Sequence, residues 1–333
     1  MTSAAGTIRP ARLTDRQALV DLSRQVHDAA EGYRRSLGVP ARSAAPPRIS
    51  LATLMPSWLP LRSPSVHLVA EWEGRLIGSC RAIEEPHRDD WVITQLDAAD
   101  SPMAAEVRYS LLKSMIEEGA QHNVARYHAA CADVPENMEL FGQLSFMPYA
   151  HEEIWYRAPG GLEGAPAAGG EPMAPATAPD AWHLFDLWTH TTPPAIARIE
   201  GYGATDWEPV GHEAVVPRSS LNPLLHFSDV RGWLLPEGQR VAGFAQHGAC
   251  RAGPHYLRFL VRDGADGADF LRAVLAALGG EALAAGILAP VRTYESAGRQ
   301  AAGDTGFEPV GQVSMLVREV QATVRQPAMV PAV

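Results

Sequence analysis

Hydrophobic and polar positions follow one another in the same succession of strands and helices in both halves of this chain. In the first half, residues 8–11 form a short apolar strand before an amphipathic helix, and residues 66–83 predict a hairpin around Glu73-Gly74. That dipeptide favours a tight turn. The pattern then predicts a strand at 91–96, a long helix at 103–121, a strand at 127–132, a short helix at 135–144 and closing strands over 145–156.

The second half repeats this order. Residues 232–247 predict the hairpin, around Glu237-Gly238, and Asp269 is expected to cap the long helix that follows the next strand. The remaining elements are a strand at 256–261, the long helix at 269–278, a strand at 286–293, a short helix at 296–304 and closing strands over 307–318.

The two halves also match residue by residue. Sliding the chain by 165 positions places Asp15 on Asp180 and Trp91 on Tyr256, and near the ends of the halves an offset of 161 places Phe146 on Phe307. Further identical pairs are Pro10 and Pro175, Leu22 and Leu187, Gly142 and Gly303, and Pro148 and Pro309. A nearly constant offset predicts two copies of one fold.

This repeat predicts the domain organisation. We expect an N-terminal domain over 1–157, a flexible linker over 158–172, a C-terminal domain over 173–322 and a loose tail over 323–333. The linker is rich in Gly, Ala and Pro and has no apolar periodicity.

Composition restricts the partners and the compartment. The net charge is −10, so on average the surface repels nucleic acid. The three cysteines have no zinc-site spacing, and we expect no metal site. Neither a signal peptide nor an apolar run of membrane-spanning length is found, so we expect a cytoplasmic protein with no membrane partner.

Four short motifs carry a family resemblance. They are Ile8-Arg-Pro-Ala-Arg12, Trp72-Glu-Gly-Arg-Leu-Ile-Gly78, Leu144-Ser-Phe-Met-Pro148 and Thr305-Gly-Phe-Glu-Pro309. With these motifs in this order, the chain resembles the GNAT acyltransferase superfamily over 7–157 and 173–320. The resemblance implies an α+β protein of two tandem GNAT-like αβ domains, each a central, mostly antiparallel mixed sheet flanked by helices.

The resemblance further implies that acetyl-CoA or another acyl-CoA is a co-substrate, with its pyrophosphate at a glycine-rich turn before the long helix. In the first unit this stretch, residues 97–106, has no glycine and carries three carboxylates. The second unit is therefore the better candidate for binding acyl-CoA. The alternative is that its glycines form only a turn. The predicted cofactor-binding residues are Leu260, Val261, Arg262, Gly264, Gly267 and Ala268.

The tyrosine that often acts as general acid in this family is absent, because Phe141 and Ala302 fill its place. Tyr294 and Glu295 end a strand where an amine could be reached, so they are the candidate catalytic residues, with Glu295 as general base. The alternative is that Glu295 caps the next helix and Tyr294 packs. His128, Cys131 and Asp133 hold the comparable place in the first unit.

Two functions remain open. One is an acyl-CoA-dependent N-acyltransferase acting on a small-molecule amine, with one domain active and the other structural. The alternative is a catalytically degenerate or repurposed tandem GNAT fold that binds a ligand or a protein partner. Transfer from aminoacyl-tRNA is disfavoured by the acidic net charge. The oligomeric state is left open.

Overall fold

The structure of the chain is a computed structural model. It describes residues 6–36, 54, 64–85, 88–160, 173–208, 216–251 and 253–320. The predicted tail and residues 161–172 of the predicted linker lie outside the described residues. Within the described part, no helix combines the length and the apolar character needed to cross a membrane.

The first half follows the predicted order of elements. Its elements are β1 (Thr7–Pro10), α1 (Arg16–Ser36), β2 (Ser65–Trp72), β3 (Arg75–Glu84), β4 (Asp90–Ala98), α2 (Ala104–Gln121), β5 (Arg126–Ala132), α3 (Pro135–Gln143) and β6 (Met147–Arg157). The β2–β3 hairpin turns at Glu73-Gly74, where both residues have positive φ. The turn chemistry read from the sequence therefore places this hairpin correctly.

The second half repeats the order with one helix more. Its elements are β7 (Ala174–Pro175), α4 (Ala181–Thr191), α5 (Pro194–Glu200), β8 (Phe227–Glu237), β9 (Arg240–Cys250), β10 (His255–Val261), α6 (Gly267–Ala285), β11 (Ile287–Arg292), α7 (Ser296–Asp304) and β12 (Glu308–Glu319). The cap of α6 is Asp266 rather than Asp269, because the Asp269 N–H donates to the Asp266 carboxylate at 3.0 Å.

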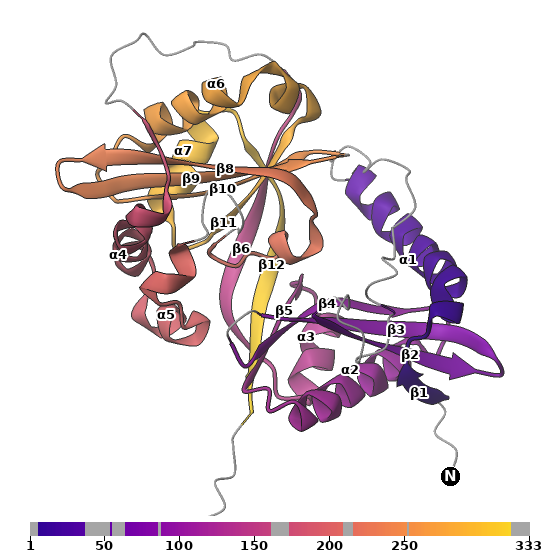
Figure 1. Ribbon diagram of the computed structural model, residues 1–333. Coiled ribbons are helices and arrows are strands. Elements are labelled where there is room, and N and C mark those ends of the chain that lie inside the picture. Colours follow the sequence, from indigo (N-terminus) through magenta and orange to yellow (C-terminus); the bar gives the residue numbers. More distant parts are fainter. Residues whose placement is uncertain are drawn as a thin grey trace, which may run out of the picture.

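The twelve strands in the described part of the chain form one continuous sheet. Their order is β1-β2-β3-β4-β5-β12-β6-β11-β10-β9-β8-β7. The repeat equivalents are β1 and β7, β2 and β8, and so on to β6 and β12. Equivalent strands lie at equal distances from the two ends of the sheet. The last strands are exchanged: β12 lies beside β5 of the first unit, and β6 lies beside β11 of the second. Figure 1 shows β6 and β12 running together between the two lobes.

This exchange corrects the prediction of two closing strands in each unit. Each unit supplies one long closing strand, β6 or β12, and the closing strand of the other unit pairs with it. The exchanged strands also complete the two cores. Leu316 of β12 is buried in the core of the first unit, and Trp155 of β6 packs against the core of the second. The two units are therefore joined by pairing and packing as well as by the chain.

Candidate functional site

In the first unit, β4 and β5 separate after a short stretch of pairing. They pair in parallel from Asp90–Arg126 to Val92–His128, although both strands continue further. On its other side β4 has a bulge, because β3 pairs with Ile93 and then with Gln95, leaving Thr94 as the extra residue. A bulge bends its strand and redirects the side chains that follow. The bend accompanies the opening between β4 and β5.

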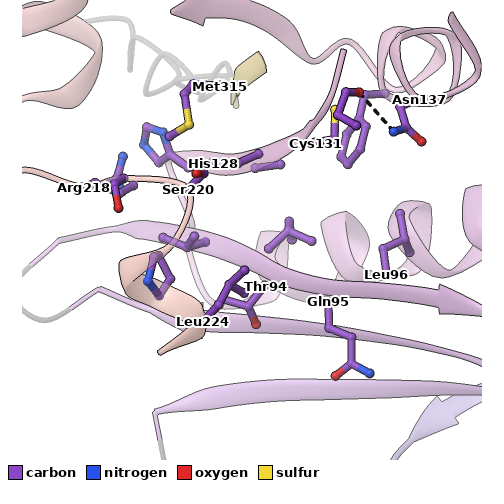
Figure 2. Close-up of a pocket in the computed structure, with 18 of the residues that line it drawn as sticks. Thr94, Gln95, Leu96, His128, Cys131, Asn137, Arg218, Ser220, Leu224 and Met315 are labelled. Carbon is purple, nitrogen blue, oxygen red and sulfur yellow. Dashed lines mark hydrogen bonds between the residues drawn. The ribbon is translucent and has the colours of Figure 1, made fainter. Parts of the chain in front are cut away.

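A cavity of about 460 Å³ occupies this opening. Figure 2 shows part of its lining, with His128, Arg218, Ser220 and Met315 toward one end and Cys131, Asn137 and Leu96 toward the other. The lining residues are Val92–Asp97 of β4, His128–Ala132 of β5, Arg108 of α2, Asn137, Leu140 and Phe141 of α3, Arg218–Ser220, Pro223 and Leu224 of the second unit, and Met315 of β12.

One side of the cavity is formed by helices of the first unit. Arg108 and Leu140 line it and also line a second cavity of about 450 Å³ between α2 and α3, so the two cavities adjoin there. The Arg108 Nε is buried and has no hydrogen-bond partner among the described residues. Three carboxylates, those of Glu106, Glu136 and Glu139, also line the second cavity.

The opposite side is formed by residues 216–224 of the second unit, which we name the covering segment. Two buried contacts hold it to the first unit. The Arg218 guanidinium donates to the Glu85 carboxylate, with Nε at 2.9 Å from Oε1. The Ser220 N–H and hydroxyl donate to Glu152 Oε1 at 2.8 Å and 2.5 Å. The first unit's cavity is therefore completed by the second unit.

Burial shifts the pKa of three groups that line the cavity. It raises the pKa of the Asp97 carboxyl and raises the pKa of the Cys131 thiol to about 11. It lowers the pKa of His128 to about 4, although Asp90 lies 3.5 Å from His128 Nε2. At neutral pH the cavity thus presents a neutral imidazole, a neutral thiol and a carboxyl that accepts a proton more readily than usual.

In the second unit β10 and β11 also separate, after pairing in parallel at His255–Ile287 and Tyr256–Leu288, but that unit has no bulge on the neighbouring strand pair and side chains fill the space. Its β9–β10 register runs from Gly248–Tyr256 to Gly243–Val261 without a bulge. Between β10 and the end of β11, Arg258 donates to both oxygens of Glu295, at 2.9 Å and 2.5 Å, and both residues are buried. By the repeat offsets, Arg258 corresponds to Ile93 of the first unit.

The predicted cofactor-binding residues of the second unit lie near one another, in a different setting from the one expected. Leu260 and Val261 are buried in the core, and Arg262 donates to Asp186 at 3.0 Å. Gly264 has a positive φ of 87°. A Cβ on Gly267 would lie 2.9 Å from Val261, so close packing requires this glycine.

A cavity of about 510 Å³ does lie over this turn, with Gly264, Gly267 and Ala268 in its lining. Asp263, Asp266 and Asp304 line it too, and no arginine does. Three carboxylates without a cation repel a pyrophosphate. The cofactor-binding role of these residues stays a prediction, and the charges oppose it.

The two predicted catalytic residues are both engaged in the fold. Glu295 accepts from Arg258 and from the Arg292 N–H at 3.0 Å, and it precedes α7 as its N-cap residue. Tyr294 packs in a small cluster with Ile196 and Met315, and burial raises its pKa. The packing of Tyr294 matches the structural alternative, whereas Glu295 holds the N-cap position of α7 without a side-chain cap hydrogen bond. The catalytic roles of both residues stay predictions.

Of the three comparable residues in the first unit, His128 and Cys131 line the cavity. Asp133 is half exposed and lies 3.8 Å from His151. The sequence did not indicate the covering segment, because no motif links residues 216–224 to the other unit. In the described part of the chain, no group of three or more His, Cys, Asp or Glu side chains is placed to hold a metal ion.

Comparison with known proteins gives the fold a name. No protein-family model matches the sequence, and no curated protein matches it. A solved tandem GNAT protein from the clavulanic acid biosynthesis pathway, without acetyl-CoA, superposes with a TM-score of 0.58 at 13% identity over 94% of this chain and 98% of its own. The chain has the tandem GNAT fold.

A second tandem-length match supports this assignment. A GCN5-related N-acetyltransferase from Sphaerobacter thermophilus superposes with a TM-score of 0.55 at 14% identity, covering 96% of this chain and 97% of its own. The predicted fold class is confirmed: both GNAT-like units are present, and each has a mostly antiparallel mixed sheet flanked by helices. At these identities the likeness concerns the fold.

Proposed function

We propose that the chain is an acyl-CoA-dependent N-acyltransferase acting on a small amine, and that the first unit holds the active site. The observation that carries this proposal is the opening between β4 and β5 beyond Val92 and His128, with its cavity of about 460 Å³. The two solved structures described above, which cover 94% and 96% of this chain, are of GNAT proteins, and one is named an N-acetyltransferase. The second unit contributes structure and the covering segment.

The cavity suits an extended chain with amide groups. Past Val92 the side of β4 that faces β5 has no strand partner in the described structure, so an amide of the pantetheine arm can pair with it as a short strand would. The phosphates would lie toward the second cavity, near Arg108. Glu106, Glu136 and Glu139 line this second cavity as well, and Arg108 is the cationic side chain in its lining that favours an anion there.

The chemistry of N-acyl transfer requires an amine without its proton. The amine nitrogen attacks the thioester carbonyl, the C–N bond forms as the C–S bond breaks, the thiolate leaves, and the nitrogen gives its extra proton to solvent as the amide forms. Asp97 lines the cavity, and its raised pKa suits it to take the proton from the ammonium group. Phe141 cannot return a proton to the thiolate, so we propose that solvent does.

Calorimetric titration with acetyl-CoA, longer acyl-CoAs and free CoA tests this proposal. Ala132→Trp adds a large ring to the lining of the first cavity at an exposed position, and Ala268→Trp adds one to the cavity over the turn of the second unit at a half-buried position. We expect binding by the wild type and by Ala268→Trp, and at least tenfold weaker binding by Ala132→Trp.

The other outcomes each have a meaning. Loss of binding only in Ala268→Trp would move the site to the second unit, as the glycines there first indicated. If the wild type binds none of these compounds, the proposal fails and the repurposed fold becomes the better description. Circular dichroism of both variants shows that they are folded.

A further inference from the structure

The covering segment brings a cationic group to the acceptor side of the cavity. Arg218 lines the cavity, yet its side chain is only 3% exposed. Its position is fixed from both ends. Glu85 accepts from the guanidinium, and the Tyr202 hydroxyl accepts from the Arg218 backbone N–H at 2.8 Å. A donor held in this way needs little reordering to bind a ligand.

One hydrogen-bond donor of the Arg218 guanidinium is unpaired among the described residues. Its Nε and Nη2 face Glu85, whereas Nη1 is buried and has no hydrogen-bond partner among the described residues. The neighbouring His128 has both ring nitrogens buried, and Asp90 lies 3.5 Å from its Nε2. Leaving a charged donor unmet in the interior is costly, so such a group normally has a partner.

The far end of the same cavity carries a carboxylate, the charge opposite to that of Arg218. Asp97 lines it, and the hydrogen bond found for its carboxylate in the described residues is the one from Gln95. Figure 2 shows Gln95 and Leu96 away from the end where Arg218, Ser220 and His128 gather. The cavity thus has a cationic donor at one end and a carboxylate at the other, which matches a molecule with both charges.

We propose that the acyl acceptor is a small molecule that carries an amine and a carboxylate separated by several carbon atoms, with the carboxylate bound by Arg218 and the amine directed toward Asp97. This inference rests on the proposed function and adds the class of acceptor. The second unit then determines specificity for the reaction carried out in the first. Arg218 is a substrate-binding residue that acts through its Nη1 donor.

The test uses the whole chain with acetyl-CoA and matched pairs of acceptors, 4-aminobutyrate with butylamine and 6-aminohexanoate with hexylamine. Transfer is followed through the released CoA thiol, and acceptor binding by calorimetry with CoA present. We expect kcat/KM to be about ten- to a hundredfold higher for each acid, mainly through KM, since an ionic hydrogen bond is lost in the amine.

Two changes at Arg218 assign the preference. The double variant Glu85→Gln/Arg218→Gln removes both partners without leaving either charge alone and should abolish the preference for the acids. Arg218→Lys keeps the charge beside Glu85 but removes the planar set of donors, and it should lower the preference by about tenfold. The control Asp229→Asn/Arg231→Gln removes an exposed Arg–Asp pair of strand β8 and should leave the preference unchanged.

Failure of this inference is distinct from failure of the proposed function. If acetyl-CoA binds but the acids are not preferred over their amines in binding or in turnover, the acceptor class is wrong and the acyltransferase proposal stands. A preference that persists in the folded double variant also overturns the role of Arg218. If no CoA ester binds at all, both proposals fail.

Discussion

Arg258 and Glu295 form a buried ion pair in the second unit at the positions that Ile93 and Val134 hold in the first. In the first unit the same place lies beside an open cavity and a bulged strand, and in the second it is filled and the strand is regular. Two copies of one fold have thus diverged at the point where β4 separates from β5 and β10 from β11. The charged pair gives the second unit a closed interior there.

The first prediction concerns this ion pair. Glu295→Gln leaves the Arg258 charge buried without its partner and should lower the free energy of unfolding by about 3–5 kcal/mol. The double variant Arg258→Ile/Glu295→Val introduces the residues of the first unit and should be within about 2 kcal/mol of the wild type. Urea unfolding followed by circular dichroism measures both.

The same variants separate two views of Glu295. With the active site in the first unit, the double variant should retain acyl-CoA binding and turnover within about threefold, because neither residue lines the first cavity. If Glu295 is a general base, turnover should fall by about a hundredfold or more even where the double variant is stable.

The second prediction concerns the packing of α2 on β5. A Cβ on Gly119 would lie 1.9 Å from the Tyr127 hydroxyl oxygen, which donates to the Ile116 carbonyl at 2.9 Å. Gly119→Ala should therefore destabilise the protein by about 1–3 kcal/mol, although alanine favours a helix by about 1 kcal/mol. Gly142→Ala on α3, where a Cβ meets nothing within 4 Å, should stabilise it. A lower melting temperature for Gly142→Ala than for Gly119→Ala would contradict this packing.

Much of the fold could be read from the repeat. The constant offset predicted two units, and the Glu73-Gly74 and Glu237-Gly238 turns placed both hairpins. The exchange of β6 and β12 could not be predicted, because the two strands are repeat equivalents and either one can pair beside β5 or β11. A pattern of apolar positions defines a strand and its buried face, and it does not tell which copy of a repeat will be its neighbour.

The candidate site was predicted less well, for two physical reasons. Gly267 looked like a residue that admits a phosphate, whereas the structure shows that Val261 and Ala301 leave no room for a Cβ. Glycine serves close packing and ligand approach equally well. The cavity of the first unit also depends on a bulge at Thr94 and on the covering segment, which lies more than a hundred residues further along the chain. Neither has a local motif.

The third prediction is a loss of stability in mild acid. Burial lowers the pKa of His67, His128 and His247 to about 4, from about 6.5 when unfolded. Between these values the unfolded chain binds more protons, so the free energy of unfolding should fall as the pH drops from about 6.5 to 4, by up to about 1.4 kcal/mol per pH unit for each histidine. Melting temperatures across this range measure the slope.

His67→Leu provides the control for this slope. His67 is buried, and neither of its ring nitrogens has a hydrogen-bond partner in the described residues, so an apolar side chain of similar size can replace it. The variant should lose about a third of the pH dependence. An unchanged slope would mean that His67 is not held neutral in the folded protein.

The last prediction follows from the exchanged strands. A protease site introduced within residues 161–172 allows the chain to be cut between the units after folding. Because β12 pairs with β5 from Val313–Ala132 to Glu319–Arg126, and β6 pairs with β11 from Glu152–Arg292 to Arg157–Ile287, each fragment holds a strand inside the other's sheet. Leu316 is moreover buried in the first unit's core. We expect the two fragments to elute together in gel filtration and to separate only in denaturant. Separate elution of two folded fragments under native conditions would show that each unit keeps its own closing strand.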